Sequence, residues 1–187
     1  EIDTMILMEA FGKGLVLEPF FASTVLGAKA IADGGNEALK TEMLPGVVEG
    51  SRQLTLAYAE AQSRFDLEDI ITHAKSDGQD YVINGHKSMV LHAGSAQQIV
   101  VSTRTSGGQA DKAGISLFLI DADAPGVEIT SFPTVDGQQA SEIKLEGVKV
   151  SSTRLLGELD NGYELLNALA TAGILALAAE AVGAMEI

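Results

Sequence analysis

The sequence of 187 residues contains no cysteine, and it has only 4 prolines and 3 histidines. Without cysteine the chain can form no disulfide framework, no thiolate nucleophile and no Cys-ligated zinc or iron–sulfur site. The three histidines, His73, His86 and His92, match neither the HxxxH nor the HExxH spacing of zinc sites. The sequence therefore predicts no metal site.

Positive charge is also scarce, since 12 Lys and Arg stand against 26 Asp and Glu, for a formal net charge of −14. Because phosphate contacts require a basic surface, nucleic acid is not expected as a principal partner. The shares of hydrophobic and charged residues, 46% and 20%, are typical of a globular protein. No Walker loop, nucleophile elbow or GxGxxG before a helix occurs, which disfavours P-loop enzymes, α/β hydrolases and Rossmann dehydrogenases.

Three stretches with different hydrophobic periodicity predict an α+β fold. Residues 1–52 have helical spacing and are expected to form a partial N-terminal helical domain. Residues 53–158 alternate apolar and polar positions between turn signals, which predicts about six to eight short strands in an antiparallel β-barrel or sandwich. Residues 159–187 return to helical spacing and predict the first helix of a truncated C-terminal helical domain.

Local patterns give sharper expectations. Asn36 is expected to cap a short helix over residues 37–44, which Pro45 brings to an end. Asn84-Gly85, between two apolar runs, predicts a two-residue β-hairpin turn. Residues 165–179 carry no charge but fall short of the ~20 residues that a bilayer needs, so they predict a buried helix and no membrane span. Since no stop signal follows, this helix is expected to continue in a longer protein.

Few polar residues suggest chemistry by themselves. Glu60 and Asp66 follow the first predicted strand, but a loop spacing fixes no geometry, so two solvated carboxylates are preferred to an acid–base pair. His92 ends an apolar segment without an identified partner, so we expect a packed, hydrogen-bonded histidine and not a catalytic one. The residues alone therefore predict no reaction.

Several segments, in order along the chain, resemble acyl-CoA dehydrogenases. Residues 57–66, Ala-Tyr-Ala-Glu-Ala-Gln-Ser-Arg-Phe-Asp, resemble the stretch that usually reads TEPxxGSD, and residues 81–87 are similar to the xxINGxK segment, which usually continues as WITN. Further likeness to the family covers residues 37–45, 114–120, 125–127, 142–150 and 155–157. The resemblance spans nearly the whole chain, and the most similar subgroup is the small subunit of two-subunit, pimeloyl-CoA-type dehydrogenases.

The resemblance implies a helical N-terminal domain, a middle β-barrel domain and a C-terminal helical bundle that is cut short. It implies FAD as the cofactor and oxidation of an acyl-CoA thioester to the 2-enoyl-CoA, with the flavin as hydride acceptor. The catalytic base is expected beyond Ile187, so no catalytic residue is assigned here and the piece alone is expected to be inactive. The implied partners are an acyl-CoA substrate, electron-transfer flavoprotein as electron acceptor, and further subunits of a homo- or hetero-oligomer, in the cytoplasm.

Carried over position by position, the resemblance assigns cofactor contacts to a set of seven residues. Three of them would line the flavin, two would approach its pyrophosphate, one would stand where a Trp covers the isoalloxazine and one where a Thr meets its reactive edge. In that order they are Leu56, Tyr58 and Ala59, then Arg64 and Phe65, then Met89, and finally Leu91.

This chain departs from the family pattern at several of those positions, three of which lose a hydroxyl group. Side-chain hydroxyls are absent at Ala59, Phe65 and Leu91, which predicts weaker flavin binding unless Arg64 offsets the loss at the pyrophosphate. Arg64 is expected to form a local positive patch with two other cations, Lys87 and Arg104. An alternative function is a noncatalytic or flavin-degenerate subunit that scaffolds a catalytic partner, and a third is a β-barrel binding module without flavin.

Overall fold

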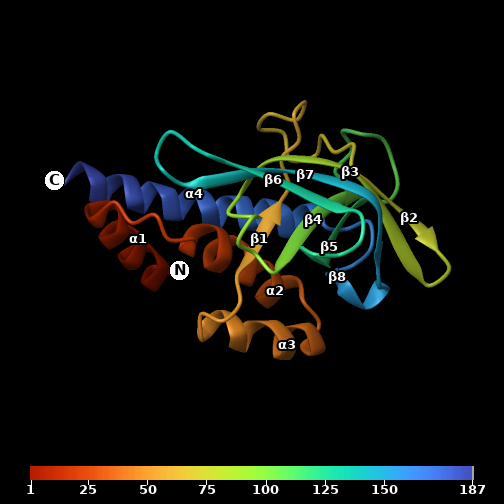
Figure 1. Cartoon of the computed structure of the whole chain (residues 1–187), viewed down its shortest axis with the longest axis horizontal. Helices are drawn as coiled ribbons and strands as arrows, with labels where there is room; N and C mark the ends of the chain where they lie inside the picture. Colours follow the sequence, from red (N-terminus) through yellow and green to blue (C-terminus); the bar gives the residue numbers. More distant parts are fainter. Residues whose placement is uncertain (187) are drawn as a thin grey trace.

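The computed structural model describes residues 1–186, and Ile187, the last residue of the predicted third domain, lies outside the described residues. Helices lie at both ends of the chain, with the strands between them (Figure 1). The first helices are α1 (Ile2–Gly14), the π-helix η1 (Phe21–Ala28), α2 (Lys29–Gly34) and α3 (Glu37–Val48). The strands are β1 (Leu54–Ala57), β2 (His73–Asp77), β3 (Asp80–Leu91), β4 (Gln98–Arg104), β5 (Ile115–Asp121), β6 (Val127–Pro133), β7 (Gln139–Val150) and β8 (Leu155–Leu156). The short 3-10 helix η2 (Ser152–Arg154) precedes β8, and α4 (Tyr163–Met185) follows it.

The strands form one sheet with the order β6-β7-β3-β2-β4-β5-β8, and β1 pairs with β4 beside this path. Most ladders are antiparallel, whereas β1 and β2 run parallel to β4. In residues 1–186 no ladder joins β6 to β8, so the sheet does not close by backbone pairing. The predicted α+β fold is confirmed: along the chain, helices come before and after a strand-rich middle.

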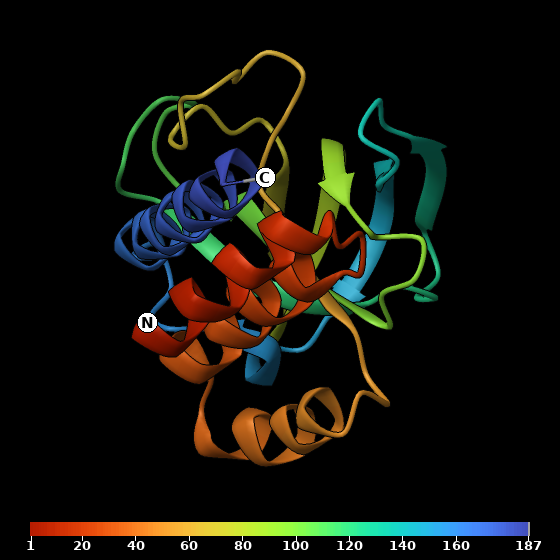
Figure 2. The same cartoon turned by 90° about the vertical axis from the view of Figure 1, so that its left-hand side faces the viewer.

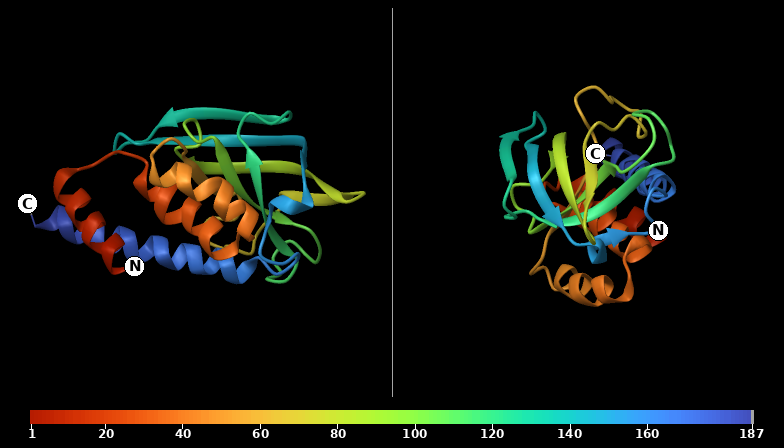
Figure 3. Two further views of the ribbon diagram at one scale, coloured as in Figure 1. Left: turned by 90° about the horizontal axis from the view of Figure 1, so that it is seen from below. Right: turned by 90° about the vertical axis from the view of Figure 1, so that its right-hand side faces the viewer.

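The middle strands are buried on both faces, which places them between two apolar layers. Along β5, Leu117 and Leu119 face a cluster shared with the helices, while Phe118 and Ile120 face a second cluster among the strands. This alternation follows from the two-residue period of a strand. The helices therefore cover one face of the sheet, and in the view from below α4 lies on that side and extends past the sheet to the C-terminus (Figure 3).

The Asn84-Gly85 pair does not form the predicted hairpin turn. The turn lies at Gly78, which has a φ of 70° between β2 and β3, and β3 continues through Asn84 and Gly85. The Asn84 side chain accepts a hydrogen bond from the Gly147 amide at a bulge in β7, where two residues oppose one. Glycine is required at 85 because a Cβ there would lie 2.6 Å from the Cα of Thr72. The prediction was wrong because Asn84 stabilises a bulge in the neighbouring strand and Gly85 allows the backbone to pass close to Thr72.

Helix α3 is longer than predicted. The Asn36 side chain caps it by accepting a hydrogen bond from the Leu39 amide, as expected, but the helix passes through Pro45 and ends at Val48. Proline removes one backbone donor from a helix. Here the last turn is retained because Leu44 and Val47 pack against the buried cluster between helices and sheet.

Helix α4 is buried along one face only. Leu166, Leu169 and Ala176 are buried in the fold, whereas Ile174 is 70% exposed, so the prediction of a buried helix holds for one face only. Helix α1 packs along the C-terminal part of α4 (Figure 2). By length and composition α4 is the one helix in residues 1–186 that would suffice to cross a membrane, but core helices of globular proteins share these properties.

Candidate functional site

Two adjoining pockets lie between α4, η1 and the ends of β1 and β3, with Phe21 and Leu177 in both walls. The first, which we name the Tyr58 pocket, has a volume of about 330 Å³. The second, the Met89 pocket, has a volume of about 350 Å³. The Tyr58 pocket is lined mainly by Phe21, Leu26, Leu56, Tyr58, Arg64, Phe65, Leu67, Ala170, Gly173, Ile174 and Leu177. The Met89 pocket is lined mainly by Met8, Phe11, Phe20, Phe21, Met89, Leu91, Asp136, Gln138, Leu177 and Glu180.

The structure divides the seven expected cofactor residues between the two pockets. Leu56, Tyr58, Arg64 and Phe65 line the Tyr58 pocket, while Met89 and Leu91 line the Met89 pocket. The seventh, Ala59, lines neither pocket and contributes its backbone instead: its carbonyl accepts a hydrogen bond of 2.9 Å from the amide of Ser88.

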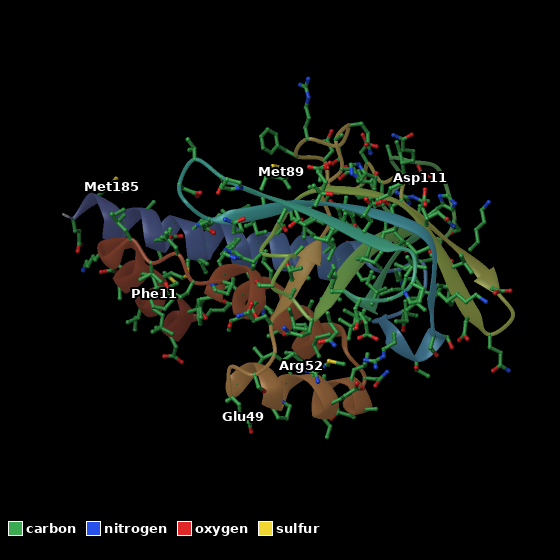
Figure 4. All side chains as sticks on the ribbon, in the orientation of Figure 1. Phe11, Glu49, Arg52, Met89, Asp111 and Met185 are labelled. Atoms are coloured by element: carbon green, nitrogen blue, oxygen red, sulfur yellow. The ribbon has the colours of Figure 1, made fainter. Side chains whose placement is uncertain are left out.

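The ends of β1 and β3 are thus joined directly. A second bond, from the Thr55 hydroxyl to the carbonyl of Leu91 at 2.6 Å, ties the same two strands. The side chains at the junction remain accessible, since Tyr58 is 38% exposed and Met89 is 53% exposed. Figure 4 shows Met89 near the surface, on the opposite side of the molecule from Arg52 and Glu49.

A β-bulge sets the direction of Met89. Lys87 pairs with Ile143 and Val90 pairs with Ser141, so Ser88 and Met89 together oppose the single residue Glu142. Met89 has a φ of 54°, and the Glu142 carboxylate accepts hydrogen bonds from the Ser88 hydroxyl at 2.9 Å and the Met89 amide at 3.4 Å. The bulge turns the Met89 side chain out of the core while Lys87 and Val90 stay buried.

Segment 58–72, which joins β1 to β2, contains turns but no helix or strand (gold loop at the top of Figure 1). Arg64 lies on it with a φ of 50°, and the adjacent Phe65 is 96% exposed. Left-handed backbone at a non-glycine residue is strained and concentrates at functional sites. Arg64 and Met89 are two of the five non-glycine residues with positive φ in residues 1–186, and both belong to the expected set.

The base of this segment holds a buried ion pair that the sequence did not predict. Lys87 is fully buried, and its ammonium donates to the Glu60 carboxylate at 2.8 Å. Glu60 is 5% exposed, so the prediction of two solvated carboxylates is wrong for Glu60 and holds for Asp66, which is exposed. Glu60 and Lys87 lie 27 positions apart in the sequence and are brought together by the pairing of the strands. The one hint of this contact in the sequence was a lysine within an apolar strand, since a buried charge needs a partner.

The two charges change each other's titration. Burial alone would raise the pKa of Glu60, but the positive charge of Lys87 and its hydrogen bonds outweigh that effect and lower it. Burial lowers the pKa of Lys87 to about 8, although Glu60 opposes the shift. Both groups are therefore ionised at neutral pH.

The expected positive patch does not form, because two of its three members are committed elsewhere. Lys87 is enclosed in the ion pair, and Arg104 donates to the backbone carbonyls of residues 68, 109, 111 and 113 at 2.7–2.8 Å. Of these three cations, Arg64 alone is exposed and lines the Tyr58 pocket.

Two further polar residues belong to this region: His92, which contacts the pocket residue Gln138, and Glu180, which lines the Met89 pocket. The His92 ring nitrogen lies 3.3 Å from the side-chain oxygen of Gln138, which confirms the expected hydrogen-bonded histidine. Glu180 of α4, which the sequence did not single out, lines this pocket. Its pKa is raised, first by burial and then by the negative charge of Asp136.

Comparison with known proteins gives consistent matches. The family described as "Acyl-CoA dehydrogenase, middle domain" matches residues 55–148. The probable acyl-CoA dehydrogenase YngJ of Bacillus subtilis (strain 168) is 31% identical over 167 residues, covering 88% of this chain and 44% of that protein.

Solved structures match over almost the whole chain. Butyryl-CoA dehydrogenase from Megasphaera elsdenii superposes with a TM-score of 0.89 at 25% identity, over 96% of this chain and 48% of that one. The ChsE4-ChsE5 complex from Mycobacterium tuberculosis gives a TM-score of 0.84 at 26% identity, over 98% of this chain and 46% of the matched chain. The chain therefore spans less than half the length of these relatives.

Proposed function

This chain belongs to the acyl-CoA dehydrogenase family, and from that premise we propose that it forms one wall of an FAD site in an enzyme that oxidises acyl-CoA thioesters to 2-enoyl-CoA. The observation that carries the proposal is the direct bond between Ala59 and Ser88, which joins the two strand ends expected to meet the flavin. Accessible apolar side chains lie on both sides of this junction, Tyr58 in one pocket and Met89 in the other.

The residues present fit a flavin in two respects. Leu56, Tyr58 and Met89 offer apolar surface of the kind that an isoalloxazine ring packs against, and Arg64 is a cation able to pair with a pyrophosphate. When bound, FAD would supply the hydride acceptor. This chain's own residues would hold the ring, exclude water from one side of it and position it for a thioester.

The remaining parts of the proposal concern the whole protein. We place the catalytic carboxylate outside this chain, which covers less than half of its relatives, and we assign residues 1–52, 53–158 and 159–187 to three structural parts. Acyl-CoA as substrate, electron-transfer flavoprotein as electron acceptor, assembly into a homo- or hetero-oligomer and a cytoplasmic location complete it. A solved structure at 26% identity is a chain of the ChsE4-ChsE5 complex, which supports the proposed assembly.

A flavin titration of the intact protein tests the proposal. We expect FAD to bind with quenching of its fluorescence, and an acyl-CoA to bleach the bound flavin under anaerobic conditions. Met89→Glu places a charge at the proposed ring contact and is expected to weaken FAD binding by about tenfold or more. Val48→Glu alters an exposed apolar residue at the end of α3 and is the matched control, with unchanged affinity. Absence of flavin binding, or equal affinities in parent and Met89→Glu, would contradict the proposal.

The missing hydroxyls at Ala59, Phe65 and Leu91 favour a second candidate, a flavin-degenerate subunit that scaffolds a catalytic partner. Each lost hydrogen bond removes about 0.5–1.5 kcal/mol. Together they would weaken flavin binding by roughly one to three orders of magnitude. Restoring all three as Ala59→Thr, Phe65→Ser and Leu91→Thr is expected to raise FAD affinity if the pocket is degenerate but still shaped. An unchanged affinity removes the support for this candidate.

A further inference from the structure

We propose that the buried ion pair of Glu60 and Lys87 is a positioning clamp, which holds segment 58–72 in the shape that presents Tyr58, Arg64 and Phe65 to the Tyr58 pocket. The clamp itself stands on contacts within the chain, and its effect on FAD affinity rests on the proposed function. Neither residue lines a pocket, so both act through the segment and not on a ligand.

The Glu60 carboxylate ties the two ends of the segment together. Glu60 lies near its start, and one carboxylate oxygen accepts from the Ile71 amide at 2.9 Å while the other accepts from the Thr72 amide at 3.1 Å. The Gln62 side chain donates to the same carboxylate at 2.9 Å, and the Ser63 hydroxyl accepts from the Glu60 amide at 3.0 Å. An anionic group with two oxygens is needed to accept this many donors at once.

Lys87 fixes that carboxylate to the sheet. Its ammonium has three donors, and all three are used: the Glu60 carboxylate at 2.8 Å, the Ser102 hydroxyl at 3.0 Å and the Tyr58 carbonyl at 3.2 Å. These bonds connect the start of the segment to β3, which carries Lys87, and to β4, which carries Ser102. Lys87 thereby holds the backbone of Tyr58, the residue at the mouth of the pocket.

Stability alone does not account for such a pair. Two charges removed from water are expensive to bury, and apolar residues of similar volume are commonly as stable in their place. Segment 58–72 has no ladder or helix of its own, and Glu68 in its second half is held separately, because its carbonyl accepts a hydrogen bond from Arg104. The ion pair adds a fixed position for the first half of the segment, which carries Tyr58, Arg64 and Phe65.

The test compares two double variants of the same chemistry. Glu60→Gln with Lys87→Met removes both buried charges, and the glutamine keeps one acceptor oxygen where two amides need one each. Lys144→Met with Glu146→Gln is the matched control, because these residues form an exposed ion pair at 2.8 Å away from the segment. Arg64 is the one tryptic site within residues 58–72, so cleavage after Arg64 reports the opening of the segment.

We expect the clamp variant to unfold in urea at the same concentration as the control, to be cleaved after Arg64 about tenfold faster, and to bind FAD about tenfold more weakly. Cleavage at the parent rate would overturn the clamp. Faster cleavage in the clamp variant with a parent protein that binds no FAD would support the clamp and overturn the proposed function.

A second measurement on the unaltered protein does not depend on a variant that folds. Ile71 is 52% exposed, yet its amide and that of Thr72 are bonded to Glu60. We expect these two amides to exchange with deuterium about a hundredfold more slowly than those of Arg64 and Phe65, after correction for intrinsic rates. Equal exchange at the four amides would also overturn the clamp.

Discussion

Replacement of Gly183 by alanine tests the contact between α1 and α4 that forms part of the Met89 pocket wall. A Cβ at Gly183 would lie 1.9 Å from the carbonyl oxygen of Glu9, and a Cβ at Gly12 would lie 2.0 Å from that of Glu180. The two glycines therefore let the helix backbones touch from both sides. The obstructing atoms belong to the main chain, so they cannot rotate away, and the helices must separate by about 1.5 Å to restore an ordinary contact.

The magnitude follows from two opposing effects. Alanine in place of a helical glycine gains about 1 kcal/mol from helix propensity. Overpacking of a tight contact costs about 1–3 kcal/mol, and the upper end applies because the backbone is rigid. We therefore expect Gly183→Ala to lower the free energy of unfolding by about 2 kcal/mol.

Urea unfolding followed by circular dichroism measures this difference, with Gly14→Ala as the control. Gly14 is the last residue of α1, the helix that faces Gly183, and its added Cβ would meet only the methyl of Val16 at 3.3 Å. We expect the control to be as stable as the parent or slightly more stable. If Gly183→Ala also matches or exceeds the parent, the close approach of α1 and α4 is refuted as a constraint on the fold.

Three further predictions concern the site and the core. Arg64→Gly should be about 1 kcal/mol more stable than Arg64→Ala in urea unfolding, because glycine alone is unstrained at a φ of 50°; equal stabilities would argue against strain there. Since the pKa of Glu60 lies below its ordinary 4.5 in the fold, its carboxylate stabilises the protein above pH 4.5, and this stability is lost as the pH falls through the folded pKa. The advantage of the parent over Glu60→Gln in free energy of unfolding should therefore shrink on acidification below 4.5, and an advantage independent of pH would count against the pairing with Lys87. Phe118→Ala should cost about 3–5 kcal/mol, because Phe118 is fully buried and its ring lies 4.9 Å from that of Tyr81; a loss below 1 kcal/mol, in the same unfolding assay, would contradict this packing.

The sequence predicted those features that depend on local periodicity. Apolar runs such as residues 99–101 and 115–120 became buried strands, and Asn36 became the cap of α3, since a strand period and a capping side chain act within a few residues. The Asn84-Gly85 turn was wrong for a reason outside this range. Whether a flexible pair makes a turn or a bulge depends on the opposing strand, here β7.

The electrostatics of the candidate site could not be predicted from the sequence. The family resemblance assigned Tyr58 and Met89 to the cofactor, and the structure places them in adjoining pockets beside the bond between Ala59 and Ser88. The prediction of a positive patch was wrong because the sequence shows that Lys87 and Arg104 are charged but does not show which groups they contact in the fold. Strand pairing encloses the first with Glu60, and four carbonyls surround the second.

The bulge at Ser88 and Met89 makes β3 sensitive to length as well as to composition. Without it, the alternation of faces would continue from Lys87, and Val90 would leave the core. Removal of one of the two bulged residues would restore a regular ladder and take away one of the two hydrogen bonds that the bulge donates to the Glu142 carboxylate. A side chain of another size at position 89 would therefore leave the ladder intact, whereas a deletion within this stretch would remove the bulge.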